Sequence, residues 1–320
     1  MDIFREMYRG GGVSVAGVDP RLNASRIASR RGVSRAKVAG RLREWAEYGL
    51  LQRYDVWPNP ALLGRIGFTL DIRVADRFLK EELLERLAWI DGIVAGTDFF
   101  GDWITTQYLL RAPEEIRRCT QLVRGLSGVA EVGEPIPWAP LEPARALSPL
   151  DRRIVRVLRA FPKDALSEVA RRVGVSTRTM TSRYGRLVED RAVWFVPVFD
   201  FRALTQPVVS VSLTFSDGSQ HGPASRAYRK AYPQSLELVR PGFGPVLPPN
   251  VAVFFTIIPS SARFEELERL ARNLPGVQST EILGMIRMFS FPGTIDRLMD
   301  EAEPPVLARH RTRERGLSRD

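Results

Sequence analysis

The chain has 320 residues, of which 44% are hydrophobic, and it carries a formal net charge of +10 at pH 7. This length and composition suffice for about two to four small domains with their own cores. The chain has one cysteine, Cys119, which excludes an intramolecular disulfide framework. Cys119 lies in a helical pattern that predicts a position in the core. No run approaches the roughly 18 apolar residues of a membrane span and the N-terminus lacks a signal-peptide pattern, so we expect a cytoplasmic protein without membrane contacts.

One segment of the chain occurs twice. Residues 25–41 (SRIASRRGVSRAKVAGR) recur without a gap as residues 167–183 (SEVARRVGVSTRTMTSR), with seven identities in seventeen positions. The offset of 142 residues is much longer than the roughly 20–50 residues of solenoid and propeller repeats. The sequence therefore predicts a tandem duplication of a whole module.

The repeated segment has the pattern of a helix-turn-helix. In the first copy, Gly32 can take the positive φ that ends a helix, and Ser34 follows where an N-cap should stand. Val38, Leu42 and Trp45 then recur at helical spacing and predict one buried face for the second helix. The second copy repeats this pattern and is preceded by a helix that Ser148 and Pro149 should start.

The opposite face of each second helix carries hydrogen-bond donors. Such a helix fits the major groove of DNA, where base edges and flanking phosphates can accept hydrogen bonds from these side chains. An ordinary solvated helix face is the alternative interpretation. Residues 21–53, 148–191 and 305–320 together carry +16, so the rest of the chain is acidic, and this concentration favours nucleic-acid binding. The candidate DNA-binding residues are Ser34, Arg35, Lys37, Arg41 and Arg43 in the first copy, and Ser176, Thr177, Arg178, Thr179 and Arg183 in the second.

Each helix-turn-helix leads into a strand-like segment, residues 49–56 or 192–199, that resembles a wing. Both copies then continue as strand, helix, strand, strand, helix, strand, the βαββαβ order of a ferredoxin-like domain, whose open sheet face should pack on the sheet of the other copy. The expected elements are 66–74, 80–87, 93–99, 103–110, 113–126 and 129–136, and then 208–215, 224–232, 235–240, 251–258, 263–274 and 277–282.

These patterns predict an α+β fold with two copies of a winged helix-turn-helix followed by a ferredoxin-like βαββαβ domain. The expected units are residues 1–60, 61–138, 147–202 and 203–292, with a linker at 137–146 and a basic disordered tail at 303–320.

This order of elements, with LLQRYDVWPNPALLG between the two domains of the first copy, resembles the Lrp/AsnC family of transcription regulators. The resemblance implies that the ferredoxin-like domains mediate dimerisation, and homo-oligomers through their sheets, and that they sense an amino acid or another small metabolite. The family's Gly-x-x-Asp turn resembles Phe100-Gly101-Asp102-Trp103, so Gly101 and Asp102 are candidate effector-binding residues. Ile104 stands where the family's acid would be.

A sequence-specific DNA-binding regulator is therefore the first functional hypothesis, with double-stranded DNA as partner. One chain would form an intramolecular pseudo-dimer, whose unlike recognition helices read an asymmetric palindrome with half-sites about 34–36 Å apart, or a multiple of that distance. We expect no cofactor, no metal site and no enzymatic activity.

Two alternatives remain open. Siroheme decarboxylases, enzymes of the heme pathway, share this architecture, but the resemblance implies histidine and tyrosine side chains around the second and third strands. Residues 93–110 and 235–258 contain no histidine, and the chain has only His221 and His310. The third reading is an assembly or RNA-binding scaffold.

Overall fold

The computed structural model describes residues 28–29, 33–138, 145–233, 235–237 and 246–302. Most of the helix expected before Gly32, the middle of the linker and the basic tail lie outside the described residues. The side chain of Arg41, a candidate DNA contact, also lies outside them.

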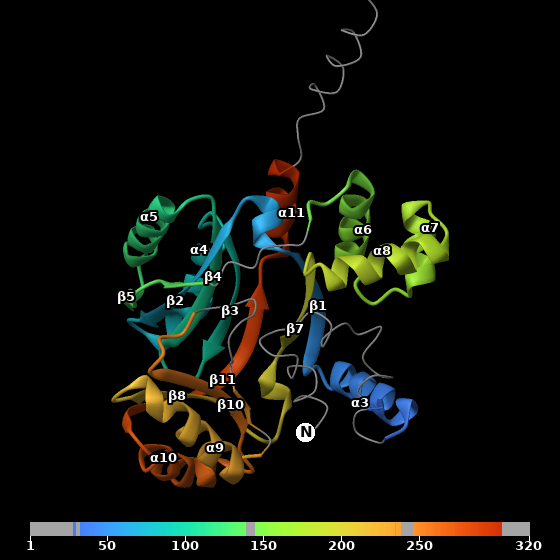
Figure 1. The fold of residues 1–320 in the computed structure, drawn as a ribbon. Coiled ribbons are helices and arrows are strands. Elements are labelled where there is room, and N and C mark those ends of the chain that lie inside the picture. Colours follow the sequence, from blue (N-terminus) through green and yellow to red (C-terminus); the bar gives the residue numbers. More distant parts are fainter. Residues whose placement is uncertain (1–27, 30–32, 139–144, 234, 238–245, 303–320) are drawn as a thin grey trace, which may run out of the picture.

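The first half of the chain (Figure 1) begins its described elements with a helix and a strand, followed by a sheet domain. The elements are α3 (Arg35–Glu47), β1 (Leu51–Pro58), η2 (Pro60–Leu63), β2 (Ile66–Val74), η3 (Arg77–Leu79), α4 (Lys80–Leu87), β3 (Ile93–Phe99), β4 (Trp103–Leu110), α5 (Pro113–Arg124), β5 (Val129–Val132) and β6 (Ile136–Pro137).

The second half has three helices, a strand, a second sheet domain and a last helix. They are α6 (Pro149–Ala160), α7 (Leu166–Val173), α8 (Thr177–Glu189), β7 (Val193–Phe199), η4 (Phe201–Ala203), β8 (Val208–Phe215), η5 (Gly218–Gln220), α9 (His221–Ala231), β9 (Leu236–Glu237), β10 (Val251–Ile257), η6 (Ser261–Arg263), α10 (Phe264–Arg272), β11 (Val277–Ser290) and α11 (Pro292–Glu301).

Each half contributes four strands in the same order, β5-β2-β4-β3 and β11-β8-β10-β9, which corresponds to 4-1-3-2 within each βαββαβ unit. The short strand β6 of the first half also pairs with β2 and adds a ninth strand. Alternate residues of each strand face two different layers. Phe68, Leu70 and Ile72 of β2 pack into a core under α4 and α5, and Val211 and Leu213 of β8 pack into an equivalent core under α9 and α10. The predicted α+β class, helix-turn-helix with ferredoxin-like units, is confirmed.

The two sheets are joined differently from our expectation. The pattern ended the last strand at Ile282, whereas β11 continues to Ser290 and pairs with β3 along its second part. The result is one nine-stranded sheet in which β11 borders both halves. The partner changes between Gly284, which pairs with β8, and Met285, which pairs with β3, and a register shift follows between Met285 and Arg287. Edge-to-edge pairing of backbone groups thus joins the sheets, a contact that side-chain patterning does not report.

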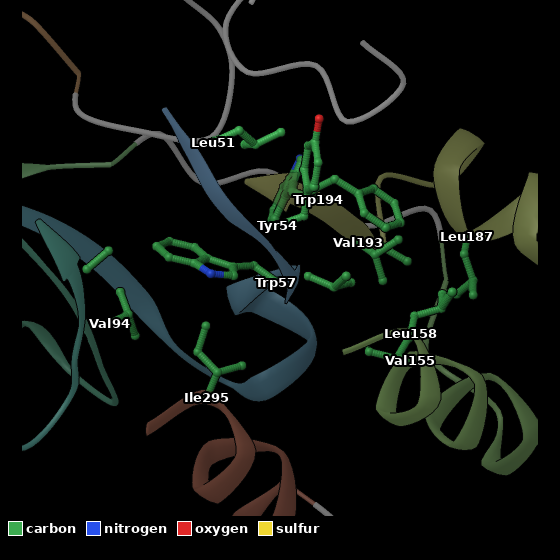
Figure 2. Packing of buried hydrophobic residues seen from close by; sticks show 14 of the residues in the cluster. Leu51, Tyr54, Trp57, Val94, Val155, Leu158, Leu187, Val193, Trp194 and Ile295 are labelled. Atoms are coloured by element: carbon green, nitrogen blue, oxygen red, sulfur yellow. The ribbon is translucent and has the colours of Figure 1, made fainter. Parts of the chain in front are cut away.

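The strands expected as wings form a ribbon with each other. β1 pairs antiparallel with β7 of the other half, with Trp57 opposite Trp194 and Val56 opposite Phe195. Figure 2 shows the core on this ribbon, where Trp57 lies near Val94 and Ile295. All of these side chains are buried, and burying aromatic side chains of this size is a large stabilising contribution. The ribbon is therefore part of a hydrophobic core that both halves share.

Helix α6 begins as expected and docks on a helix that the sequence pattern missed. Ser148 caps α6 in a capping box with Asp151. Arg156 pairs with Asp300 of α11, and Arg159 pairs with Asp296 and donates to the carbonyls of Val56 and Pro292. Part of the positive charge between residues 148 and 191 is thus neutralised inside the molecule.

Candidate functional site

A cavity of about 380 Å³ lies between the open face of the sheet and the β1–β7 ribbon. Helices α4, α5, α9 and α10 pack on the other face of the sheet, so none of these four helices covers this face. Strands of both halves contribute to the lining, and the ribbon closes it with Trp57, Val196 and Val198. A hydrogen bond connects the ribbon to β11. Arg53 of β1 donates to the hydroxyl of Ser290 on β11 at 2.6 Å, and it also donates to Asp55 of β1 at 3.1 Å. A volume of this size suits a small organic ligand.

The floor of the cavity is polar. It carries small hydroxyl side chains and three carboxylates, which are Thr69, Thr97, Thr105, Ser210, Ser212, Asp71, Glu131 and Glu281. The hydroxyl of Thr105 donates to Asp71 Oδ1 at 2.6 Å. Burial raises the pKa of Asp71, which this hydrogen bond partly offsets. Burial, with a smaller contribution from the charge of Asp71, raises the pKa of Glu281. The charge of Asp71, from the first half, therefore acts on Glu281, from the second half.

The walls of the cavity are aromatic and aliphatic. Trp103, Trp138, Phe99, Phe201, Phe255, Phe289, Met285 and Met288 line them. Trp138 is held by a hydrogen bond from its Nε1 to Thr69 Oγ1 at 2.8 Å. The turn between β3 and β4 is held by Lys80, whose ammonium donates to Asp98 at 2.8 Å and to the carbonyls of Phe99 and Trp103. Rings on rigid strands with fixed turns form a preorganised surface.

Sequence reasoning missed this site. The effector residues that it named, Gly101 and Asp102, lie in the turn between β3 and β4, and neither is among the residues that line the cavity. A usable signal was present in β2, where Thr69 and Asp71 alternate with apolar residues. Such alternation predicts a face that is not core, but it does not identify the partner of that face.

The predicted DNA-binding residues occupy the expected helices. Ser34 accepts a hydrogen bond from the Lys37 N–H at 3.2 Å, and Ser176 accepts one from the Thr179 N–H at 3.1 Å, so both serines are the N-caps of α3 and α8. The side chains that flank these caps are exposed: Arg35, Lys37 and Arg43 on α3, and Thr177, Arg178 and Thr179 on α8.

Arg183 has a different environment. It is half-buried and lies 3.4 Å from the buried carboxylate of Asp151, so it links α8 to α6. Arg171 and Arg172 also pair inside the second half, with Glu168 and Asp164. Arg178 and Arg186 of α8 are both exposed and have no acidic partner among the described residues. Arg178 lies in the first turn of α8, beside the serine cap, so it is the better placed of the two to contact an anion at the N-terminal end of the helix.

Three further expectations concern the chemistry of the chain. Cys119 is buried, as predicted, and burial raises the pKa of its thiol to about 12, which keeps it unreactive. The described part of the chain holds no group of three or more histidine, cysteine, aspartate or glutamate side chains that could bind a metal. No helix within the described ranges is long and apolar enough to span a membrane.

Comparisons with known proteins give a fold but no family. No family model matches the sequence, and no curated protein matches it. The siroheme decarboxylase NirDL is similar in structure over 94% of this chain and 98% of its own, with 13% sequence identity and a TM-score of 0.51. AsnC from E. coli and an AsnC family transcriptional regulator from Agrobacterium tumefaciens match 47% and 43% of this chain, at 14% and 17% identity, each with a TM-score of 0.30.

At such low identity, the likeness to NirDL establishes a shared fold over nearly the whole chain. It also corrects one expectation. We expected the chain not to be an enzyme, and this expectation is contradicted, because a solved protein that shares the fold over 94% of this chain is an enzyme. The architecture that we associated with regulators is therefore equally an enzyme's architecture.

Proposed function

We propose that the chain binds a small organic molecule in the central cavity and binds double-stranded DNA through α8 and α3. The observation that carries the DNA-binding part is the placement of the two helices. In Figure 1, α3 and α8 flank the β1–β7 ribbon on the side away from the sheet. Both begin with a serine cap and exposed donors, which is the arrangement that a pair of major-groove readers needs.

The same ribbon connects the two parts of this function. β1 follows α3 after Glu47 and β7 follows α8 after Glu189, so each strand continues directly from a recognition helix. Trp57 and Val196 of the ribbon line the cavity. A ligand that changes the position of these side chains acts on the strands that orient the helices. Because the helices differ in sequence, we expect unlike half-sites on the DNA.

Selection from random-sequence duplex DNA at two salt concentrations tests this function. An asymmetric two-part motif that survives the higher salt is the expected result. Arg178→Ala should then reduce the slope of log affinity against log salt by about 1, as for one lost phosphate contact. Arg171→Ala, an exposed arginine on the neighbouring helix α7, should leave the slope unchanged. A bound pool without any motif, or equal slopes for both variants, would refute the proposal.

A second function rests on a different observation. NirDL, which is similar in fold over 94% of this chain, is a siroheme decarboxylase, and this comparison favours an enzyme that uses the same cavity at least as well as it favours a regulator. Asp71 and Glu281, whose pKa values are raised, would be its acid groups. The described parts of β3, β4, β9 and β10 contain no histidine, and Tyr108 packs into the helix-covered core. The chemistry would therefore depend on carboxylates.

Anaerobic incubation with siroheme, followed by mass spectrometry of the tetrapyrrole, tests the enzyme. Stepwise loss of carbon dioxide that disappears in Asp71→Asn, and not in Glu131→Gln, would establish it. An unchanged tetrapyrrole over many hours, with a protein that still binds its DNA motif, would exclude this reaction and retain the first function.

A further inference from the structure

Among the described residues that line the cavity, the charged side chains are all acidic. Asp71, Glu131 and Glu281 face it, and no lysine, arginine or histidine is among its lining residues in the described chain. Glu131 is offset by Arg73, whose guanidinium lies 2.7 Å from the carboxylate. Asp71 and Glu281 have no basic partner within the described ranges. The cavity thus carries negative charge that the lining residues of the described ranges do not compensate.

These two carboxylates sit on opposite halves of the sheet, where Asp71 is half-buried and Glu281 is exposed. Asp71 is paired in register with Thr105 on β4, and Glu281 with Ser212 on β8. Hydroxyl groups can donate hydrogen bonds to a carboxylate, but they leave its charge in place. Burial raises the pKa of both groups, and the charge of Asp71 adds to this effect at Glu281. A positive group between the two carboxylates would stabilise their ionised forms and offset the repulsion between them.

The walls supply the second part of a recognition site. Three indole rings, those of Trp57, Trp103 and Trp138, line the cavity together with the rings of Phe99 and Phe255. Aromatic rings attract organic cations through their quadrupoles, most strongly where water is excluded. They also bury the apolar body of such a molecule.

We propose that the ligand of the central cavity is an organic cation, an amine with an aromatic or aliphatic body, whose charged group lies between Asp71 and Glu281. This inference rests on the function proposed above only in taking the cavity as the ligand site.

Isothermal titration calorimetry with three indole probes tests it. Tryptamine is cationic, N-acetyltryptamine is neutral and indole-3-acetate is anionic, whereas all three have the same ring. We expect tryptamine to bind at least about tenfold more tightly than the other two. The double variant Asp71→Asn/Glu281→Gln should abolish this preference. Glu131→Gln, which removes a carboxylate already paired with Arg73, should retain it.

The outcomes separate this inference from the function on which it rests. Neutral or anionic probes that bind as tightly as tryptamine, and that are excluded by the cavity-filling variant Thr97→Trp, would keep the cavity as a ligand site and overturn the cation. Absence of binding by all three probes would also overturn it. DNA binding and siroheme turnover are measured without these probes, so their failure would be recognised independently.

Discussion

Replacing Lys80 by methionine should strongly destabilise the first half of the protein. The Lys80 and Asp98 side chains are only 7% and 6% exposed, and their charged atoms lie 2.8 Å apart. Removing one member of a buried ion pair leaves the other charge uncompensated, which costs about 3–5 kcal/mol. Arg287 Nε lies 3.7 Å from Asp98 and compensates it in part. We therefore expect the free energy of unfolding to fall by about 3 kcal/mol, at the lower end of that range.

Urea denaturation, monitored by circular dichroism and tryptophan fluorescence, measures this loss. We expect the slope of the free energy of unfolding against urea concentration to stay unchanged. Lys163, an exposed lysine in the turn after α6, provides the control, and Lys163→Met should change stability by less than about 0.5 kcal/mol. The double variant Lys80→Met/Asp98→Leu removes both charges and should recover about half of the loss or more. A loss below about 1 kcal/mol for Lys80→Met, or a double variant no more stable than the single one, would refute the reasoning.

Three further substitutions probe the cavity and the helix contacts. Burial raises the pKa of Asp71 above its usual 3.8, so the native state loses stability as the pH rises through that raised pKa. Asp71→Asn should therefore be more stable than the parent protein at pH 7 and equally stable at a pH below 3.8. A variant that is less stable than the parent at pH 7 would contradict this. Gly96→Ala should lower the free energy of unfolding by about 1–3 kcal/mol in the same urea titration. A Cβ at this position would lie 2.3 Å from the Phe289 ring and from the Thr105 carbonyl oxygen. Wild-type stability of this variant would show that the strands that carry these two residues can move away from β3. Arg159→Met removes donors from the carbonyls of Val56 and Pro292 and should cost about 1–3 kcal/mol with faster amide exchange in α11, whereas unchanged exchange would mean that α11 docks without it.

Local patterns determined the elements of each half. The alternation of β2, β3 and β4 predicted their bounds at Ile66–Val74, Ile93–Phe99 and Trp103–Leu110, as observed. Serine caps at positions 34, 148 and 176 predicted where three helices begin. These signals succeed because hydrogen bonding within a helix, and burial of one strand face, depend on residues close in sequence.

Only the tertiary structure decided how the halves meet and where the cavity lies. The second part of β11 pairs with β3, about 190 residues away, through backbone groups that any sequence possesses. Asp71 and Glu281 are brought to one cavity by that same joining of sheets, so neither is marked by its neighbours. Arg183 appeared in the sequence as one more donor on a basic helix, and it became a partner of Asp151 only when α6 packed on α8. The sequence by itself determined the modules and their basic helices, whereas long-range strand pairing and ion pairing, which depend on the packed structure, determined the site.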